Sequence, residues 1–475
     1  MVTTIIKKEI QNNVYSFRFL VTFVLLLAVV AFTIFVLTND YVKKVDEYSQ
    51  RQAEIENYLK SYAHYNRVGS IISPSQPPIP FYALIRGLSS DVNIGRFDND
   101  PLPVMFPLLD LTFIVAILLS LVALLFSYDA VCGEKEDGTL KLMLSNSISR
   151  STIVLGKIAG GTLTLLLPFL TSLLIGLLII LFNPRVSWKS ADWGALGLIF
   201  LGSLLYFAFF YGLGIFISSR HQSGSASIMT SLFVWVLLVL VIPNLSPFAA
   251  SFLSPSPSRI KIGREVSRLT DVERDQLGRK LMAERLQALT KKYPVLAENI
   301  PEAEAKERMA KDPAIREAYD ARVREVQAAW DEANRIQNEK AGSLWGELDR
   351  KEAAQTRLAA VISMISPLSD FTYLATDLSS TGLQNERYFH QIAEDWARRF
   401  DEYGRIKISL LQKQDPTKDW WNTPVDMSDR PKFTYQEAPL GLRFKQTFAD
   451  FVVLLVFNVL FFGAGYVSFI KYDVR

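Results

Sequence analysis

Long apolar segments gather towards the two ends of the chain, and a long polar stretch separates the last of them from the others. An α-helix needs roughly 20 apolar residues to cross the hydrocarbon core of a bilayer. Six segments meet this requirement, at residues 17–37, 106–126, 161–182, 195–217, 228–248 and 448–470. The sequence therefore predicts an all-α, polytopic membrane protein.

The remaining composition argues against several function classes. With 51 Lys and Arg against 48 Asp and Glu, the net charge is +3, which predicts no general attraction to nucleic acid. One cysteine, Cys132, excludes an intramolecular disulfide framework, and the scattered His64, His221 and His390 lack the usual spacing of a metal cluster. We therefore predict no metal site, no bound cofactor and no catalytic residue in this chain.

Basic residues near the ends of the apolar segments predict the orientation, because Lys and Arg are retained on the cytoplasmic side. Most of them fall on one side: Lys7, Lys8, Arg18, Lys135, Lys141, Arg150, Lys157, Arg220, Lys471 and Arg475. Arg185 and Lys189 are the exceptions. We therefore expect both termini (1–16 and 471–475) and the loop 127–160 to be cytoplasmic, and segments 39–105 and 249–447 to be extracytoplasmic.

The segment 249–447 has a mostly helical pattern. Thr270-Asp271-Val272-Glu273 is a capping-box pattern that predicts the start of a helix, which Tyr293-Pro294 ends. Asp312-Pro313 predicts the start of a second helix. Its apolar stripe contains Ile315, Tyr319, Val326, Trp330, Ala333, Leu344 and Leu348. We expect the two helices to pack against each other as a hairpin or a bundle that stands off the membrane. This region would be a structural domain or, alternatively, a ligand-binding one.

Three further features of the outer segments leave open where they lie. Residues 358–374 are less polar and either lie on the membrane surface or pack on the spans. Trp420 and Trp421 fit an interfacial aromatic belt or a core. In the smaller segment, an amphipathic helix over 42–62 precedes a proline-rich connector, which we expect to be extended.

The loop between the second and third spans has a charged run that ends in a turn. Glu134, Lys135, Glu136 and Asp137 lead into Gly138, which permits the turn. Leu140, Met143 and Leu144 then form one apolar face of a short helix. Such a helix fits a groove on a partner protein. The alternative is a solvated loop with a helix that lies on the membrane surface.

These motifs resemble those of ABC-2 type transporter permeases. The run Glu134-Lys135-Glu136-Asp137-Gly138-Thr139-Leu140, followed by Leu144-Ser145, Ser149-Arg150 and Leu155-Gly156-Lys157, is similar to the signature after the second span of that family. The resemblance extends to a short interfacial helix within 1–16 and to Phe469-Ile470-Lys471-Tyr472-Asp473-Val474-Arg475. Pro77-Pro78-Ile79-Pro80-Phe81 and Gly87-Leu88 resemble the subgroup with enlarged extracytoplasmic segments, which includes gliding-motility-type permeases.

The resemblance implies six transmembrane helices of the ABC-2, type V exporter-like architecture, in the inner membrane of a prokaryote. It also implies that the loop contains a coupling helix that docks on a separate ABC ATPase. The coupling residues would be Glu134, Lys135, Glu136, Asp137, Gly138, Thr139, Leu140, Met143 and Leu144. The chain has no Gly-x-x-x-x-Gly-Lys-Ser/Thr phosphate loop, so ATP and Mg²⁺ would be bound by the partner. Two ATPase copies and a second permease chain, identical or related, complete the expected complex with membrane lipids.

Three polar residues in the spans are candidates for an intramembrane site, namely Asp110, Asn244 and Asn458. Ionisable groups at membrane depth are costly and often functional. The alternatives are that Asp110 faces water or caps a helix, and that the asparagines bond between helices. Gly194, Gly197, Gly202, Gly212 and Gly214 of the fourth span favour close helix packing.

Three functions remain open from the sequence. The first is export of a substrate, with ATP-driven closure of the ATPases transmitted through the spans. The second is mechanotransmission, in which the outer helices act on an envelope protein and nothing crosses the membrane; the size of segment 249–447 favours it. The third is a membrane scaffold or receptor without an ATPase. No residue selects a substrate.

Overall fold

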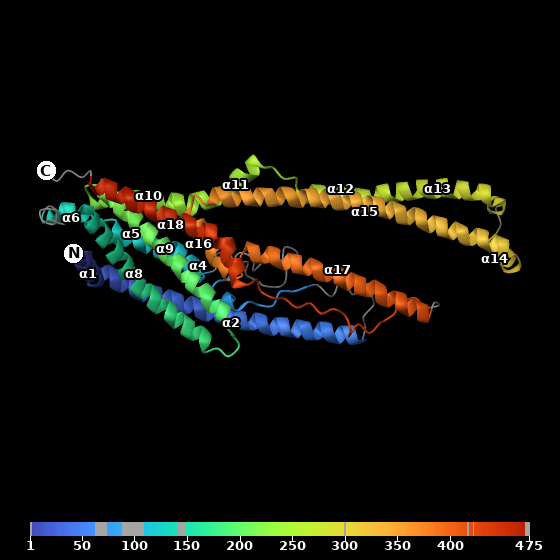
Figure 1. Cartoon of the computed structure of the whole chain (residues 1–475), viewed down its shortest axis with the longest axis horizontal. Helices are drawn as coiled ribbons and strands as arrows, with labels where there is room; N and C mark the ends of the chain where they lie inside the picture. Colours follow the sequence, from blue (N-terminus) through green and yellow to red (C-terminus); the bar gives the residue numbers. More distant parts are fainter. Residues whose placement is uncertain are drawn as a thin grey trace. The chain divides into compact units, whose positions relative to one another are not determined.

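The computed structural model describes residues 2–61, 74–87, 109–140, 142, 149–298, 301–415, 418–420 and 422–470. The chain divides into two compact units, unit 1 (Met1–Pro243 and Ser363–Arg475) and unit 2 (Asn244–Ile362). Every regular element in the described part is helical (Figure 1). This confirms the predicted all-α class.

Six helical stretches among the described residues are long and apolar enough to cross a membrane, which matches the predicted number. The bounds of these stretches are Phe17–Lys60, Leu111–Glu136, Arg150–Leu181, Ser190–Arg220, Gly224–Leu253 and Leu440–Ile470. Their helices are α2 (Phe17–Ser61), α4 (Leu111–Phe113), α5 (Ser120–Ser127), α6 (Cys132–Glu136), α8 (Arg150–Leu181), α9 (Ser190–Arg220), α10 (Gly224–Trp235), α11 (Ile242–Leu253) and α18 (Leu440–Ile470). Two π-helical stretches, η2 (Ile114–Leu119) and η3 (Val236–Val241), interrupt the second and fifth spans.

The helix predicted over 42–62 is present, and it is continuous with the first span. No proline or glycine interrupts Phe17–Ser61, so the helix continues beyond the length that a bilayer needs. Its C-terminal end packs in a small cluster with α17 (Leu383–Gln414) and the following segment. This cluster contains Leu59, Trp396, Phe400, Val425 and Met427, with Trp420 packed against it. Trp420 therefore has the core role, and Trp421 lies outside the described residues.

The proline-rich segment is irregular over 74–79, with Ile79 extended as predicted, and it then ends in a buried turn that the sequence did not predict. Pro80–Ala83 forms a 3₁₀ turn (η1), which a proline in the first turn permits. Phe81, Ala83, Leu84 and Ile85 are fully buried in the main core. Gly87 has a φ of +79°, and a Cβ there would lie 2.2 Å from the carbonyl oxygen of Thr381. Only glycine fits this close approach.

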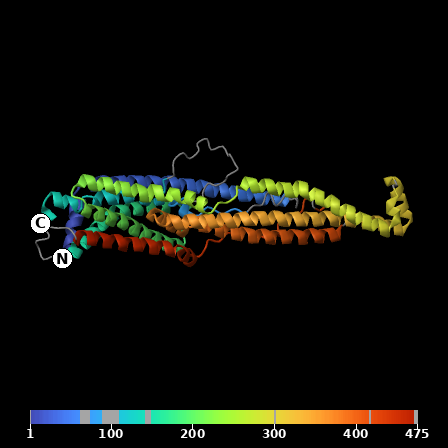
Figure 2. The ribbon, with the colours of Figure 1, turned by 90° about the horizontal axis from the view of Figure 1, so that it is seen from above.

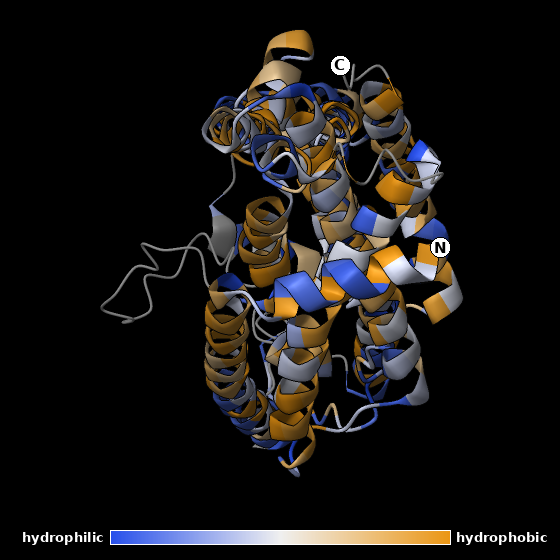
Figure 3. Cartoon of the chain, turned by 90° about the vertical axis from the view of Figure 1, so that its left-hand side faces the viewer, coloured by the Kyte–Doolittle hydropathy of each residue, from blue (hydrophilic) through white to orange (hydrophobic). Residues whose placement is uncertain are grey.

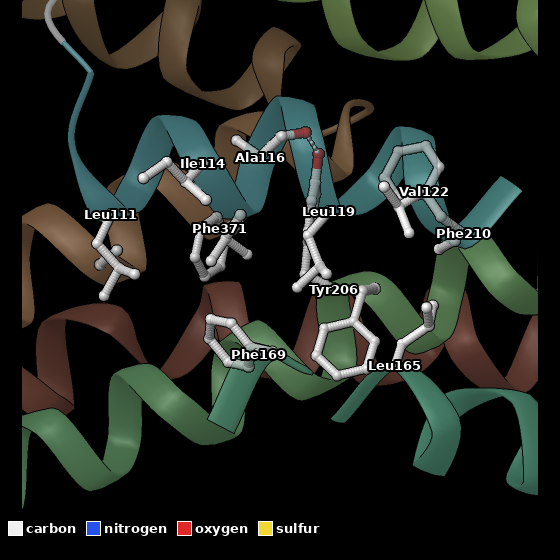
Figure 4. Close-up of a cluster of buried hydrophobic side chains, with 14 of the residues drawn as sticks. Leu111, Ile114, Ala116, Leu119, Val122, Leu165, Phe169, Tyr206, Phe210 and Phe371 are labelled. Atoms are coloured by element: carbon white, nitrogen blue, oxygen red, sulfur yellow. Dashed lines mark hydrogen bonds between the residues drawn. The ribbon is translucent and has the colours of Figure 1, made fainter. Parts of the chain in front are cut away.

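The less polar segment predicted over 358–374 contains α16 (Pro367–Leu378), which packs on the spans. Phe371 stacks on Tyr206 of α9 at 5.0 Å between ring centroids, and Leu374 lies against Gly202. Tyr206 in turn donates its hydroxyl hydrogen to the carbonyl oxygen of Ala116, at 2.7 Å (Figure 4). The core of unit 1 thus joins η2, α8, α9 and α16.

Unit 2 contains an antiparallel helical hairpin. Its first arm is α12 (Arg259–Ser267), η4 (Arg268–Glu273) and α13 (Arg274–Lys292), and its second arm is α15 (Pro313–Ser363). Arg259 pairs with Glu352, and Arg285 pairs with Glu325 at 3.1 Å. Position numbers rise along one arm as they fall along the other, so the arms run in opposite directions. The short elements η5 (Pro294–Ala297) and α14 (Glu302–Lys311) connect them.

Two of the three predicted helix limits in unit 2 are confirmed. The first arm stops at Tyr293-Pro294, and α15 starts after Asp312, whose side chain accepts from the Ala314 N–H at 2.8 Å. None of the seven stripe residues of α15 is exposed. The predicted start at Thr270 is wrong, because the arm begins at Arg259 and Ser258 caps it. The side-chain spacing of a capping box also occurs inside helices, so the pattern alone misplaced the start.

Candidate functional site

The candidate site is the end of unit 1 at which α1 (Val2–Val14), the turn after α5, α6, the start of α8 and the end of α9 meet. We call it the loop end. Figures 1 and 2 show α1 and the end of α18 at this end, and Arg150 at the start of α8 donates to the carbonyl oxygens of Phe469 and Ile470. In Figure 3, α1 lies across the ends of the spans, with hydrophilic and hydrophobic residues along its length.

A buried lysine joins three elements of the loop end. Lys157 of α8 has 2% of its side chain exposed, and its Nζ lies 2.9 Å from Glu9 Oε1 of α1 and 2.9 Å from Glu134 Oε1 of α6. Lys8 approaches Glu134 from the surface at 3.5 Å. A buried charge is tolerated when opposite charges and hydrogen bonds compensate for its lost solvation. This cluster therefore fixes α1 and α6 on α8.

Two glycines on α8 form the surface on which α1 packs. A Cβ at Gly156 would lie 2.6 Å from Ile5, and a Cβ at Gly160 would lie 2.7 Å from Glu9 and 3.2 Å from the Ile6 carbonyl oxygen. The two glycines are four residues apart, so they lie on the same face of the helix. Their lack of side chains lets α1 approach α8 closely enough for Glu9 to reach Lys157.

The charged loop is also held on the end of α9. Lys135 donates to the carbonyl oxygens of Ser219 (2.6 Å) and His221 (3.1 Å), which is a favourable place for a cation at a helix C-terminus. The Ser218 hydroxyl oxygen accepts from the backbone N–H groups of Val131 and Cys132, at 3.1 and 3.0 Å. The short α6 is thus fixed by contacts far along the chain.

A further ion pair connects the turn after α5 with the first span. Arg18 Nη1 lies 2.8 Å from Asp129 Oδ2, and the Arg18 guanidinium stands over the Tyr128 ring at 5.2 Å. Ser227 of α10 donates to the Tyr128 carbonyl oxygen at 2.6 Å. Helices α2, α8, α9 and α10 all contact this one turn or the adjacent α6, so a displacement of the loop acts on several spans at once.

The surface of the loop consists of the residues that follow this anchored part. Glu136, Asp137, Gly138 and Thr139 are exposed, and Leu142 is 70% exposed. Gly138 has a φ of +71°, and a Cβ there would meet no described atom within 4 Å, so it forms the turn that the sequence predicted. Within the residues that the structure describes, the loop end therefore presents a turn with charged residues and the large apolar side chain of Leu142.

The predicted coupling residues separate into three groups in the structure. Glu134 and Lys135 point into the anchoring contacts, whereas Glu136, Asp137, Gly138 and Thr139 are exposed. Leu140 is 1% exposed and belongs to the main core, in contrast with the exposed apolar face predicted for it. The period of a helix does not tell which face meets the protein itself. Met143 and Leu144 lie outside the described residues.

Two of the polar residues predicted inside the spans have hydrogen-bond partners on neighbouring segments of unit 1. Asp110 caps α4, where its carboxylate accepts from the Phe113 N–H at 2.7 Å and the Arg86 N–H at 3.2 Å. Asn458 of α18 donates to the Leu205 carbonyl oxygen of α9 at 2.9 Å. Asp110 therefore caps a helix and Asn458 bonds between two helices, which are the alternatives to a functional site that the sequence left open. Asn244 lies in α11, in unit 2.

The sequence did not reveal the buried cluster that holds the loop end together. Glu9, Lys157 and Ser218 make its central contacts. The available signal was Lys157 itself, because it is a charged residue close to an apolar span. A lysine that is buried there needs a partner of opposite charge. Nothing in the sequence separated this role from an ordinary positive charge at a span end.

The fold and the loop end define a multi-pass, all-α membrane protein with a polar loop fixed across the ends of its spans. A family model described as ABC-2 family transporter protein matches residues 3–474. The chain therefore belongs to the ABC-2 family, and it is the permease type of subunit, for which the family implies an ABC ATPase partner.

Two relatives carry the name "Probable ABC transporter permease protein NosY". The one from Pseudomonas aeruginosa (strain PAO1) is 36% identical over 132 residues, which is 28% of this chain and 48% of the relative. The one from Stutzerimonas stutzeri is 35% identical over 132 residues, with the same coverage. The chain thus spans about half the length of these relatives.

Proposed function

We propose that this permease couples ATP hydrolysis by a separate ABC ATPase to the export of a substrate across the inner membrane, with the loop end on the cytoplasmic side. The observation that carries the proposal is the construction of the loop end. An exposed turn, Glu136–Thr139 with Leu142, follows directly on an α6 that Lys135 and Glu134 fix to α9 and α8.

Such an arrangement suits the transfer of a movement. A partner that displaces the exposed turn displaces α6, and the Lys157 cluster passes the displacement to α1 and α8. Ser218 and Lys135 pass it to α9 in the same way. Packed helices respond to such a push by rigid-body or shear motion. In the assembled transporter, two ATPases would act on two permease chains, identical or related.

The continuous first helix favours mechanotransmission as a second function. Helix α2 runs as a single helix from Phe17 near the loop end to Ser61. Its outer part is tied to the segment after α17, since Arg430 donates to Glu56 at 2.7 Å and Leu59 packs with Trp396. A movement of α2 would therefore reach α17 and the segment that follows it, because no hinge interrupts the helix. This part of unit 1 would then act on an envelope protein.

The test of the coupling surface is Leu142→Glu with Asp137→Lys in the full chain. Both side chains are exposed, so we expect the double variant to fold and co-purification of the partner ATPase to fall at least tenfold. The matched control is Val272→Glu with Asp271→Lys, which changes an exposed apolar and an acidic residue of unit 2. Undiminished co-purification of the ATPase with the loop variant would overturn the proposal.

Export and mechanotransmission separate in reconstituted vesicles that contain the permease and its ATPase. Export predicts that a transported substrate stimulates the ATPase and that flux is measurable. Mechanotransmission predicts that only an added envelope protein stimulates it. A chain that binds no ATPase under any condition would instead be the scaffold or receptor considered above.

A further inference from the structure

Asp370 of α16 is a fully buried acid without a hydrogen-bond partner among the described residues. Its relative exposure is 0%, and neither Oδ1 nor Oδ2 meets a donor there. Helix α16 packs against α4, η2, α9, η3, α17 and α18. A buried polar atom without a partner is rare in native proteins and calls for a specific reason. This side chain is separate from the loop end, and none of the contacts described there involves it.

The surroundings of Asp370 offer a second acid rather than a cation. Asp450 of α18 is 6% exposed and close enough for its charge to act on Asp370. Arg443, about two helical turns before Asp450 on α18, donates instead to the Leu378 carbonyl oxygen and to Ser380 Oγ. On α9, the hydroxyl group of Tyr206 donates its hydrogen bond to the carbonyl oxygen of Ala116 and not to Asp370.

The remaining charged groups near α16 are engaged elsewhere. Asp110 caps α4, and Asp377, near the end of α16, accepts from the Gln384 N–H at 3.2 Å while Arg387 of α17 acts on it. The stretches η2 and η3 contain only apolar residues. No cation in the described part of the chain therefore pairs with the Asp370 carboxyl group.

An ionised carboxylate in this position would lack compensation, and its transfer from water would cost several kcal/mol. Burial first, and then the charge of Asp450, raise the pKa of Asp370 to about 8. In the described residues, no three His, Cys, Asp or Glu side chains are arranged to hold a metal ion. The ligand that fits a single buried carboxyl group beside a second acid is a proton.

We propose that Asp370 is a proton-binding site, which holds a proton at neutral pH and releases it to water when the packing between α16 and α18 opens. On release, the carboxyl O–H bond breaks, the proton passes to water and the carboxylate remains. The permease then takes up or gives off one proton whenever this interface opens or closes. The site does not depend on the loop end or on an ATPase.

Infrared spectroscopy of the purified chain, labelled with ¹³C at the aspartate side-chain carboxyl carbon, tests the proposal directly. The wild-type spectrum minus the Asp370→Asn spectrum should show a protonated-carboxyl C=O band at pH 7 that titrates near pH 8. Asp377→Asn is the matched control on the same helix and should keep that band. Asp450→Asn removes the second acid, so the titration of the Asp370 band should move to lower pH.

Wild-type and Asp370→Asn spectra that do not differ in this band at pH 7 overturn the proposal. Thermal unfolding gives a second readout. Asparagine imitates the neutral acid at every pH, so the Tm of Asp370→Asn relative to wild type should be higher at pH 8.5 than at pH 5. An equal difference in Tm at both pH values would contradict a proton on Asp370, even if the variant were less stable throughout.

Discussion

Lys157 at the loop end and Asp370 in α16 are both almost completely buried, but their surroundings differ. Lys157 has two carboxylates at 2.9 Å, whereas neither oxygen of Asp370 has a hydrogen-bond partner in the described part of the chain. A buried charge with partners on other elements connects those elements. A buried ionisable group without partners becomes neutral instead. These contacts are the basis of the two proposals, namely that the loop end transmits a movement and that Asp370 changes its charge when the packing around α16 opens.

The largest effect that tests this difference is expected for Lys157→Met. The substitution leaves Glu9 and Glu134 without their buried partner, and breaking a buried pair in this way costs about 3–5 kcal/mol. We expect a large fall in Tm in detergent, together with proteolytic release of α1. The control is Lys8→Met, since Lys8 is about half-exposed and 3.5 Å from Glu134, and a surface pair contributes about 0–1 kcal/mol. Equal losses from both variants would refute the anchoring role.

A pH series on Asp377 sharpens the account of α16. Burial raises the pKa of Asp377 from its ordinary value near 4 to about 6. The folded state then binds more protons than the unfolded one between these values, so this group stabilises the fold at low pH and loses that contribution as pH rises to about 6. We expect up to about 3 kcal/mol of this dependence to disappear in Asp377→Asn, measured as Tm against pH.

The position of the change on the pH scale separates the two acids of α16. The loss of stability with rising pH ends near pH 6 for Asp377, whereas for Asp370 it continues to about pH 8. A single transition shared by the Asp377→Asn and Asp370→Asn variants would mean that the acids titrate as one group, and that α16 holds no separate proton at neutral pH.

Glycine-to-alanine substitutions compare how firmly the two regions are packed. At Gly160, the new Cβ would meet Glu9 at 2.7 Å and the backbone of Ile6 at 3.2 Å, so α1 must move; such overpacking costs about 1–3 kcal/mol. At Gly202, it would meet only the tip of Leu374, which rotates at a smaller cost. The expected order of Tm values is therefore Gly202→Ala above Gly160→Ala, and the reverse order would show that α16 is the more rigid region.

The smallest change in Tm is expected for Asn458, which belongs neither to the loop end nor to α16. Its side-chain amide donates to the Leu205 carbonyl oxygen of α9 at 2.9 Å and to the Leu454 carbonyl oxygen at 2.8 Å. Hydrogen bonds between membrane helices contribute about 0.6 kcal/mol on average, so Asn458→Leu should change Tm by only a few degrees. A loss as large as that of Lys157→Met would indicate that Asn458 has a role beyond helix packing.

The sequence was sufficient for the features that depend on local composition. Apolar length found the six spans, and Asp312-Pro313 and Tyr293-Pro294 located two helix ends, because caps and prolines act within a few residues. The motif from Glu134 to Leu140 located the loop end. The capping-box pattern at Thr270 failed because a continuous helix passed through it.

Contacts between residues far apart in the chain could not be predicted from the sequence. Lys157 and Glu9 are 148 positions apart, and the burial of Leu140 and Asp370 depends on which neighbouring helix covers them. The same limit applies to the fourth-span glycines. Gly202 and Gly214 have close neighbours, but no atom of the described residues lies within 4 Å of a Cβ at Gly197 or Gly212. Composition suggested close packing for all of these positions equally.

Site-directed cross-linking tests the central claim, that the exposed turn of the loop end is where the partner ATPase docks. In a Cys132→Ser background, which removes the only cysteine, Asp137→Cys should cross-link to the ATPase in native membranes, and ATP should change the yield. Val272→Cys in unit 2, which is 51% exposed, should give no such product. Absence of the cross-link at Asp137→Cys, with the ATPase bound to the same chain, would contradict the account.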